Sequence, residues 1–192
     1  MAKKNEFKAD RPYATWFSRL MPTKLQQKAF LKWMLYSLVL LLLSVLQDVF
    51  LSRVSIFGTT TELVPCGIFL FCLLEGSERG CLFSLLSSLF YQFSGSAPGI
   101  YAIVLITFIG TFVSIFQQAF LQKGLGTAVI CTAFSMLSYK ACIYVMGVLL
   151  KQAQPGRIFL FAVSALLSVI IVPILYPIGL AIGRIGGTSW RE

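Results

Sequence analysis

The sequence has no histidine and few acidic residues, and both shortages limit its chemistry. Its 192 residues include 7 Asp and Glu against 16 Lys and Arg, and no His. Histidine is the commonest metal ligand and the side chain that most readily exchanges protons near neutral pH. Histidine-based acid/base catalysis is therefore excluded, and we expect no metal and no other cofactor.

The patterns that carry other chemistries are missing as well. The 5 cysteines lie in or beside apolar segments without a Cys-x-x-Cys pair, which indicates small core residues and not a redox site. The sequence has no Gly-x-Ser-x-Gly motif and no phosphate loop. Nucleic acid is not an expected partner, because no glycine-rich or aromatic-basic recognition pattern accompanies the basic residues. We expect a non-enzymatic protein that binds, transports or organises.

Apolar residues are what the sequence has in excess. Hydrophobic residues make up 57% of the chain and charged residues 12%, whereas soluble proteins have about 45–50% and about 25%. This composition predicts an all-α integral membrane protein, a compact bundle of about six transmembrane helices. The predicted spans are Trp33 to Leu51, Thr61 to Leu74, Cys81 to Phe93, Gly99 to Phe120, Thr127 to Leu150 and Ile158 to Ile178.

The second and third of these runs are shorter than the roughly 17–25 residues of a usual spanning helix. They either extend into their polar flanks and cross the membrane, or form a re-entrant hairpin. In both cases the two termini lie on the same side. Pro173 and Pro177 should kink the last span, because each removes a backbone hydrogen bond.

The basic residues are concentrated before the first span. Residues 1–32 hold half of them, and cations next to a span mark the cytoplasmic side and attract anionic lipid. We therefore predict that both termini are cytoplasmic in a multi-pass membrane protein. The predicted organisation is a basic cytoplasmic arm (1–32), a polytopic transmembrane domain (33–182) and a short cytoplasmic tail (183–192).

Part of the basic arm has amphipathic spacing. Its large apolar residues recur at three- and four-residue steps, which is compatible either with a helix lying in the membrane interface or with a solvated tail. Pro22 would interrupt such a helix. The apolar residues concerned are Tyr13, Trp16, Phe17, Leu20 and Met21.

A ridge of small residues follows the second span. Gly76, Gly80, Ser84 and Ser88 are spaced by four and would share one face of a helix. Small residues let a second helix approach closely, which is a main source of packing energy between helices in lipid. The ridge should be a contact face, either for another helix of the same chain or for a partner protein.

Lys140 falls inside the fifth predicted span, where a charge costs about 2.5–3.5 kcal/mol unless it is paired or hydrated. At about 1.5 Å per residue, Lys140 and Asp48 lie roughly 20–22 Å from the cytoplasmic ends of their spans. We therefore predict that Lys140 and Asp48 form an intramembrane ion pair. The alternative is that they coordinate an ion or substrate in a polar cavity.

The cytoplasmic turn between the second and third spans carries Glu75, Glu78 and Arg79. The simpler interpretation is a helix N-terminus that Ser77 caps and nearby acidic groups stabilise. The alternative is that the turn docks a partner.

Leu46 to Tyr101 resembles one family, the rod shape-determining protein MreD. That family tends to have a Leu-Gln pair late in the first span, an approach with proline to the second, a glycine-bearing turn and spaced glycines before the fourth. This sequence departs from it with Ser84 and Ser88 where glycines are commoner, and with Tyr91 where an aspartate is frequent. The matching residues are Leu46-Gln47, Ile56 to Gly58, Glu62-Leu63-Val64-Pro65, Glu75-Gly76, Gly80, and Gly95 with Gly99 and Tyr101.

The resemblance implies a non-enzymatic, multi-pass scaffold of the bacterial cytoplasmic membrane that belongs to the cell-elongation machinery. Such a protein would bind MreC, stand near MreB, RodA and a class B penicillin-binding protein, and help direct lateral peptidoglycan synthesis and rod shape. The layout is also similar to the vitamin-binding S components of energy-coupling-factor transporters, which is the second hypothesis. An ion-coupled carrier using Lys140 and Asp48 ranks third, since no pair of broken helices indicates an internal repeat.

Overall fold

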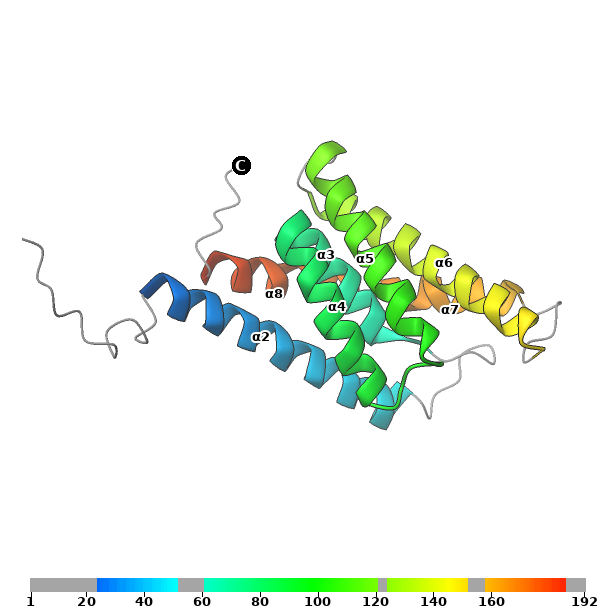
Figure 1. Cartoon of the computed structure of the whole chain (residues 1–192). Helices are drawn as coiled ribbons and strands as arrows, with labels where there is room; N and C mark the ends of the chain where they lie inside the picture. Colours follow the sequence, from blue (N-terminus) through cyan, green and yellow to red (C-terminus); the bar gives the residue numbers. More distant parts are fainter. Residues whose placement is uncertain (1–23, 52–60, 121–123, 152–157, 186–192) are drawn as a thin grey trace, which may run out of the picture.

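The structure is a computed structural model that describes residues 24–51, 61–120, 124–151 and 158–185. Within these ranges the regular structure is entirely helical, which confirms the all-α prediction (Figure 1). The helices are α2 (Lys24–Leu46), its π-helical continuation η1 (Gln47–Leu51), α3 (Leu63–Glu75), α4 (Ser77–Phe93), α5 (Tyr101–Phe120), α6 (Leu125–Leu149), α7 (Ile158–Val169) and α8 (Val172–Ile185).

Helix α3 is the centre of the molecule. It packs against each of the other described α-helices, and every residue from Leu63 to Leu74 is buried. A helix that is apolar on all sides has no face to offer to water and is stable only when other elements surround it. The short second run of the sequence is thus the core around which the other helices are arranged.

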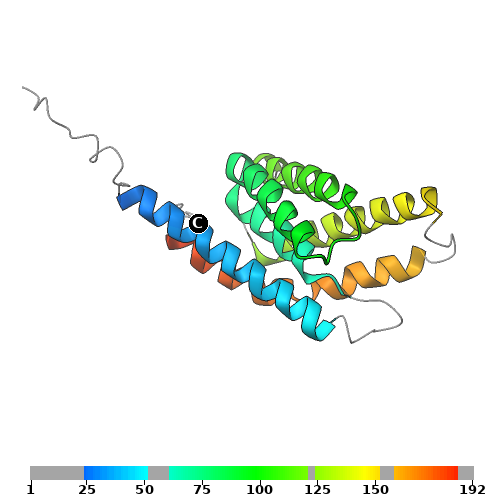
Figure 2. The ribbon, with the colours of Figure 1, turned by 60° about the horizontal axis from the view of Figure 1, so that its bottom comes forward.

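The surrounding helices form three pairs around α3. Helices α4 and α5 lie side by side on one flank, α8 runs along α2, and α7 lies along α6 (Figure 2). Glycines bring several of these helices close to α3. A Cβ on Gly67 would lie 2.8 Å from Leu43 Cδ1 of α2, and one on Gly179 of α8 would collide with Leu74.

The boundaries differ from the predicted spans at two places. Helix α2 begins at Lys24 and not at Trp33, because the residues before Trp33 mix apolar side chains with lysines and glutamines and so do not form a continuous apolar run. The last predicted span is broken into α7 and α8, which meet at 47°. Pro173 lies directly after this break, as the predicted kink requires, whereas Pro177 lies inside α8.

Among the described residues, two helical segments are long and apolar enough to cross a membrane, Gln27–Leu51 and Leu125–Leu149, and α7 with α8 would make a third if the bent pair is one span. Helix α3 and the Tyr101–Gln117 part of α5 are apolar but shorter. Residues 1–23, which include most of the basic arm, lie outside the described residues, as do Arg53, the Ile56 to Gly58 segment and 186–192 of the predicted tail.

Candidate functional site: the two ends of the central helix

The N-terminus of α3 is buried, and the backbone N–H groups from its cap residue Glu62 to its third residue Pro65 are accounted for. The first four N–H groups of any helix lack a partner within the helix. Here the Gln47 Oε1 accepts from the Leu63 N–H at 2.8 Å and from the Val64 N–H at 3.0 Å. The Glu62 N–H donates to Ser168 Oγ at 2.9 Å, and Pro65 has no N–H. Side chains from other helices therefore cap α3 completely.

Two helix irregularities lie at this end of α3. Gln47 is the first residue of the π-helix η1, and Ser168 lies in the last turn of α7, just before the bend into α8. A π-helical turn rotates the side chains that follow relative to the α-helix before it, and such turns are frequent at functional sites. Both interruptions of regular structure thus carry a side chain that caps α3.

Lys140 of α6 binds Glu62, with Nζ and Oε1 2.6 Å apart. The side chains are 7% and 18% exposed. The predicted partner, Asp48, is therefore wrong. The predicted pair rests only on the depth of the two residues along their helices. Glu62, at the N-terminus of α3, lies at a similar depth, and α6 packs against α3. A carboxylate at a helix N-terminus also has a favourable interaction with the helix dipole.

Asp48 has a different role in the structure. It is exposed in η1, and its Oδ1 accepts a hydrogen bond of 2.6 Å from Ser96 Oγ. The Ser96 carbonyl in turn accepts from the Tyr91 hydroxyl at 3.2 Å. Asp48 therefore connects the end of the first long helix to the turn between α4 and α5.

We call Gln47, Glu62, Tyr139, Lys140 and Ser168 the N-terminal junction. Two of its polar atoms, Glu62 Oε2 and the Tyr139 hydroxyl, are buried and have no hydrogen-bond partner. Tyr139 is fully buried, with its ring edge-on to Phe69 at 5.9 Å between centroids. Burying a polar atom without a hydrogen bond is unfavourable. The two atoms are each still able to form a hydrogen bond.

The other end of α3 holds a second buried ion pair. Both oxygens of Glu75 lie 2.7 Å from Lys32 Nζ of α2, and both side chains are 4% exposed. A cation beside the last turn of a helix is favoured by the helix dipole. The Tyr36 ring lies 5.9 Å from Lys32 Nζ, and its hydroxyl donates to the Gly179 carbonyl at 3.3 Å. We call Lys32, Tyr36, Glu75 and Gly179 the C-terminal junction.

The three charged residues predicted for the cytoplasmic turn therefore separate. Glu75 is part of the buried junction, whereas Glu78 and Arg79 are exposed in the first turn of α4. Ser77 is the first residue of α4 and not its cap; Gly76 occupies the cap position with φ of 84°. A left-handed φ favours glycine, which is why this residue allows the tight reversal from α3 to α4.

The predicted ridge of small residues meets α5 of the same chain. A Cβ on Gly80 would lie 2.8 Å from the Cys72 carbonyl oxygen and would collide with Ser114, and Ser84 Cβ lies 2.8 Å from the position of a Cβ on Gly110. Ser88 Oγ lies 3.1 Å from Thr107 Oγ1. Gly76 does not belong to this contact, because nothing lies within 4 Å of its Cβ position.

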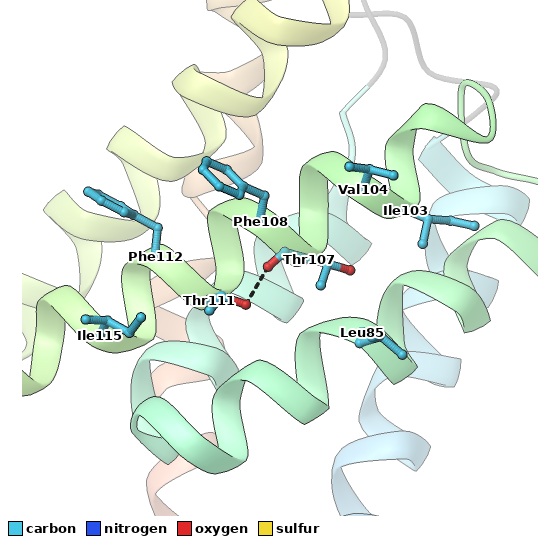
Figure 3. Close-up of a pocket in the computed structure, with 8 residues that line it drawn as sticks. All are labelled: Leu85, Ile103, Val104, Thr107, Phe108, Thr111, Phe112 and Ile115. Carbon is cyan, nitrogen blue, oxygen red and sulfur yellow. Dashed lines mark hydrogen bonds between the residues drawn. The ribbon is translucent and has the colours of Figure 1, made fainter.

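The outer side of α5 forms an apolar groove of about 520 Å³ (Figure 3). Two phenylalanine side chains point away from α5 along it, and its two threonines are linked, since Thr111 Oγ1 donates to the Thr107 carbonyl at 2.7 Å. The groove is lined by Leu85, Ile103, Val104, Thr107, Phe108, Thr111, Phe112 and Ile115.

Sequence reasoning missed Lys32, Gln47, Glu62 and Ser168 as parts of one arrangement. One signal was present: Glu62 and Glu75 bracket an uninterrupted apolar run, and a buried helix with an acid at each end requires a cation near each. The sequence gives no indication that Gln47 and Ser168 would reach the first turn of α3, because that depends on the π-helix and on the bend after α7.

Comparisons of the chain with protein-family models, with curated proteins and with solved structures found no match.

Proposed function

We propose that this chain is a non-enzymatic scaffold in the bacterial cytoplasmic membrane, part of the machinery for cell elongation. It would bind MreC, act near MreB, RodA and a class B penicillin-binding protein, and help direct lateral peptidoglycan synthesis. The proposal includes about six membrane-embedded helices and two cytoplasmic termini, with the basic arm on anionic lipid. Its starting point is the resemblance of Leu46 to Tyr101 to the MreD family.

The outer surface of the bundle supports insertion into lipid. Large apolar side chains are exposed on several helices, among them Phe108 at 72%, Phe134 at 68% and Phe159 at 72%. Two pairs of charged side chains, by contrast, are turned inward, namely Lys32 with Glu75 and Lys140 with Glu62. A soluble protein has the opposite distribution, with isolated apolar residues outside and few buried charges.

One observation carries the proposed function: segments that share features with the MreD family meet at the N-terminus of α3. Gln47, of the Leu46-Gln47 pair, caps the backbone of Leu63 and Val64, and Pro65 completes the same turn. These residues seal a central helix and form no constellation for bond-breaking chemistry. A rigid body whose core is a sealed helix is suited to presenting fixed outer faces to partner proteins.

Depletion of the protein in its native host tests this role. We expect rod-shaped cells to become round, and we expect MreC to be recovered when the tagged protein is purified from native membranes. Re-expression of the wild-type chain should restore both. Normal rod shape after complete depletion would contradict the proposal.

A second function, the vitamin-binding S component, has one observation in its favour. Gln47, Glu62, Lys140 and Ser168 bring polar side chains from η1, α6 and α7 together at the N-terminus of α3. A small number of converging polar groups is typical of a small-molecule site. Mass spectrometry of the purified protein tests it. A tightly co-purifying vitamin would favour this function over the scaffold.

A further inference from the structure

A narrow groove separates α2 from α4, and neither junction contributes a residue to its lining. The two helices run in the same direction (Figure 1), and the rings of Trp33 and Phe83 meet at 5.8 Å between centroids. The groove has a volume of about 100 Å³ and is mainly apolar and aromatic. It is lined by Trp33, Ser37 and Leu40 of α2 and by Phe83, Leu86 and Phe90 of α4, among others.

Small side chains make room in this groove, and apolar side chains surround it. Ser87 of α4 also lines it and is 4% exposed. The Ser37 hydroxyl turns back and donates to the Trp33 carbonyl of its own helix at 3.0 Å. Met34 and Leu41 lie one turn to either side of Ser37, and both are exposed. The groove therefore opens onto an apolar surface, as a site for a hydrocarbon chain requires.

A cation lies at one end of the groove. Arg79 precedes Phe83 by one turn and, at about 100° per residue, shares the side of α4 that carries Phe83 and Leu86. It is exposed and forms no ion pair with any of the described residues. Glu78 lies about 100° around the axis, on the side of Leu85, which lines the groove along α5. The α2–α4 groove therefore ends at a cation, and the α5 groove ends at an acid.

Size and charge together favour a lipid over a partner helix as the occupant. An α-helix with its side chains is about 10–12 Å wide, which is too wide for this groove, whereas a hydrocarbon chain is one methylene group wide. Arginine matches the geometry of a phosphate, and tryptophan is enriched at the level of lipid headgroups. In the orientation of the proposed function, Arg79 and Trp33 lie towards the cytoplasmic face, where anionic lipids are concentrated.

We propose that the α2–α4 groove binds one acyl chain of an anionic phospholipid whose phosphate contacts Arg79. The acyl chain lies between Trp33 and Phe90, and the headgroup stays at the membrane surface. This inference rests on the membrane insertion and orientation in the proposed function. It adds one defined lipid site to the general attraction between the basic arm and anionic lipid.

Trp33 lines the groove and serves as the probe. The full chain with Trp16→Phe and Trp190→Phe keeps Trp33 as its single tryptophan. It is reconstituted in phosphatidylcholine vesicles that contain a minor fraction of lipid with brominated acyl chains, which quench tryptophan fluorescence on contact. We expect brominated phosphatidylglycerol to be enriched beside Trp33 about fivefold over brominated phosphatidylcholine, the preference that one basic residue near the surface supplies.

Arg79→Gln should remove most of this preference. Lys28→Gln is the matched control, because it removes the same charge from an exposed lysine about 140° around α2 from Trp33, and it should keep the preference. Ser37→Leu, which narrows the groove from its exposed rim, should lower the quenching by brominated phosphatidylglycerol with Arg79 intact.

Three outcomes would overturn the proposal. Equal losses in Arg79→Gln and Lys28→Gln would show a general effect of surface charge. Equal quenching by the two brominated lipids before any further substitution would remove the lipid site but leave membrane insertion intact. Quenching by neither lipid would contradict both the lipid site and the membrane insertion on which it rests.

Discussion

The two ends of the central helix are closed in different ways. At the C-terminal junction the chain itself reverses through Gly76, the Gly80 N–H donates to the Gly76 carbonyl at 2.8 Å, and Lys32 contacts both oxygens of Glu75. At the N-terminal junction, the caps and the cation come from η1, α6 and α7. Both ends need contacts between residues far apart in the chain, such as Lys32 with Glu75 and Lys140 with Glu62, but the C-terminal end also has a local chain reversal through Gly76.

The largest expected effect on stability comes from breaking the ion pair between Lys140 and Glu62. Lys140→Leu leaves Glu62 buried without its cation, which costs about 3–5 kcal/mol. Because the penalty comes from the unpaired charge, the double variant Lys140→Leu with Glu62→Leu should be more stable than Lys140→Leu alone. Denaturant unfolding in detergent micelles measures both.

Lys28→Leu is the matched control for this pair, since Lys28 is an exposed lysine of α2 and its loss should change the unfolding free energy little. The comparison also distinguishes the observed pair from the predicted one. If Asp48→Leu, and not Glu62→Leu, rescues Lys140→Leu, the assignment of Glu62 as the partner is wrong.

The next largest effect is expected at the close contact of Gly80 with α3 and α5, near the C-terminal end of α3. Gly80→Leu would push a side chain against the Cys72 carbonyl and Ser114, and we expect a loss of about 3 kcal/mol, the upper part of the usual range for overpacking. Gly126→Leu is the control, because nothing lies within 4 Å of its Cβ position. Equal stabilities of the two variants would refute a close approach of α4 to α5 and α3.

Gln47 tests the capping of α3 at its N-terminal end. Gln47→Leu removes the acceptor for two buried N–H groups, and we expect a loss of about 2 kcal/mol. Gln27→Leu changes an exposed glutamine of the same long helix and should have little effect. Thermal unfolding of the two variants side by side measures the difference, and an unchanged midpoint for Gln47→Leu would remove the capping role.

Asp48 should give the smallest effect. Asp48→Asn keeps the size of the side chain and weakens an exposed hydrogen bond from Ser96, so we expect less than about 1 kcal/mol. The same unfolding assay applies. A loss as large as that of Lys140→Leu would indicate that Asp48 has a buried partner in the folded protein.

Much of the fold could be predicted from the apolar pattern. The helical class, the short second and third runs and the kink near Pro173 follow from hydrophobicity and from the backbone chemistry of proline. The central position of α3 could have been inferred from its composition, since Leu63 to Leu74 contains no polar side chain other than cysteine. The early start of α2 could not, because the residues before Trp33 mix apolar and basic side chains.

The candidate site was harder to predict, for a physical reason. The depth of a residue along a helix can be counted from the sequence, but the direction of its side chain cannot be predicted beyond a π-helix or a bend. That is why Asp48 was matched to Lys140, and why Gln47 was not predicted to cap α3. The ridge from Gly80 to Ser88 was predictable as a contact face because four-residue spacing defines a face in a regular helix.

Hydrogen exchange at the start of α3 tests the central claim, that the helix is sealed at both ends, most directly. The first N–H groups of a helix normally exchange fast, since they lack partners within it. We predict that the amides of Leu63 and Val64 exchange as slowly as those in the middle of α3, and that Gln47→Leu selectively accelerates them. Fast exchange of these two amides in the wild-type protein would contradict the account.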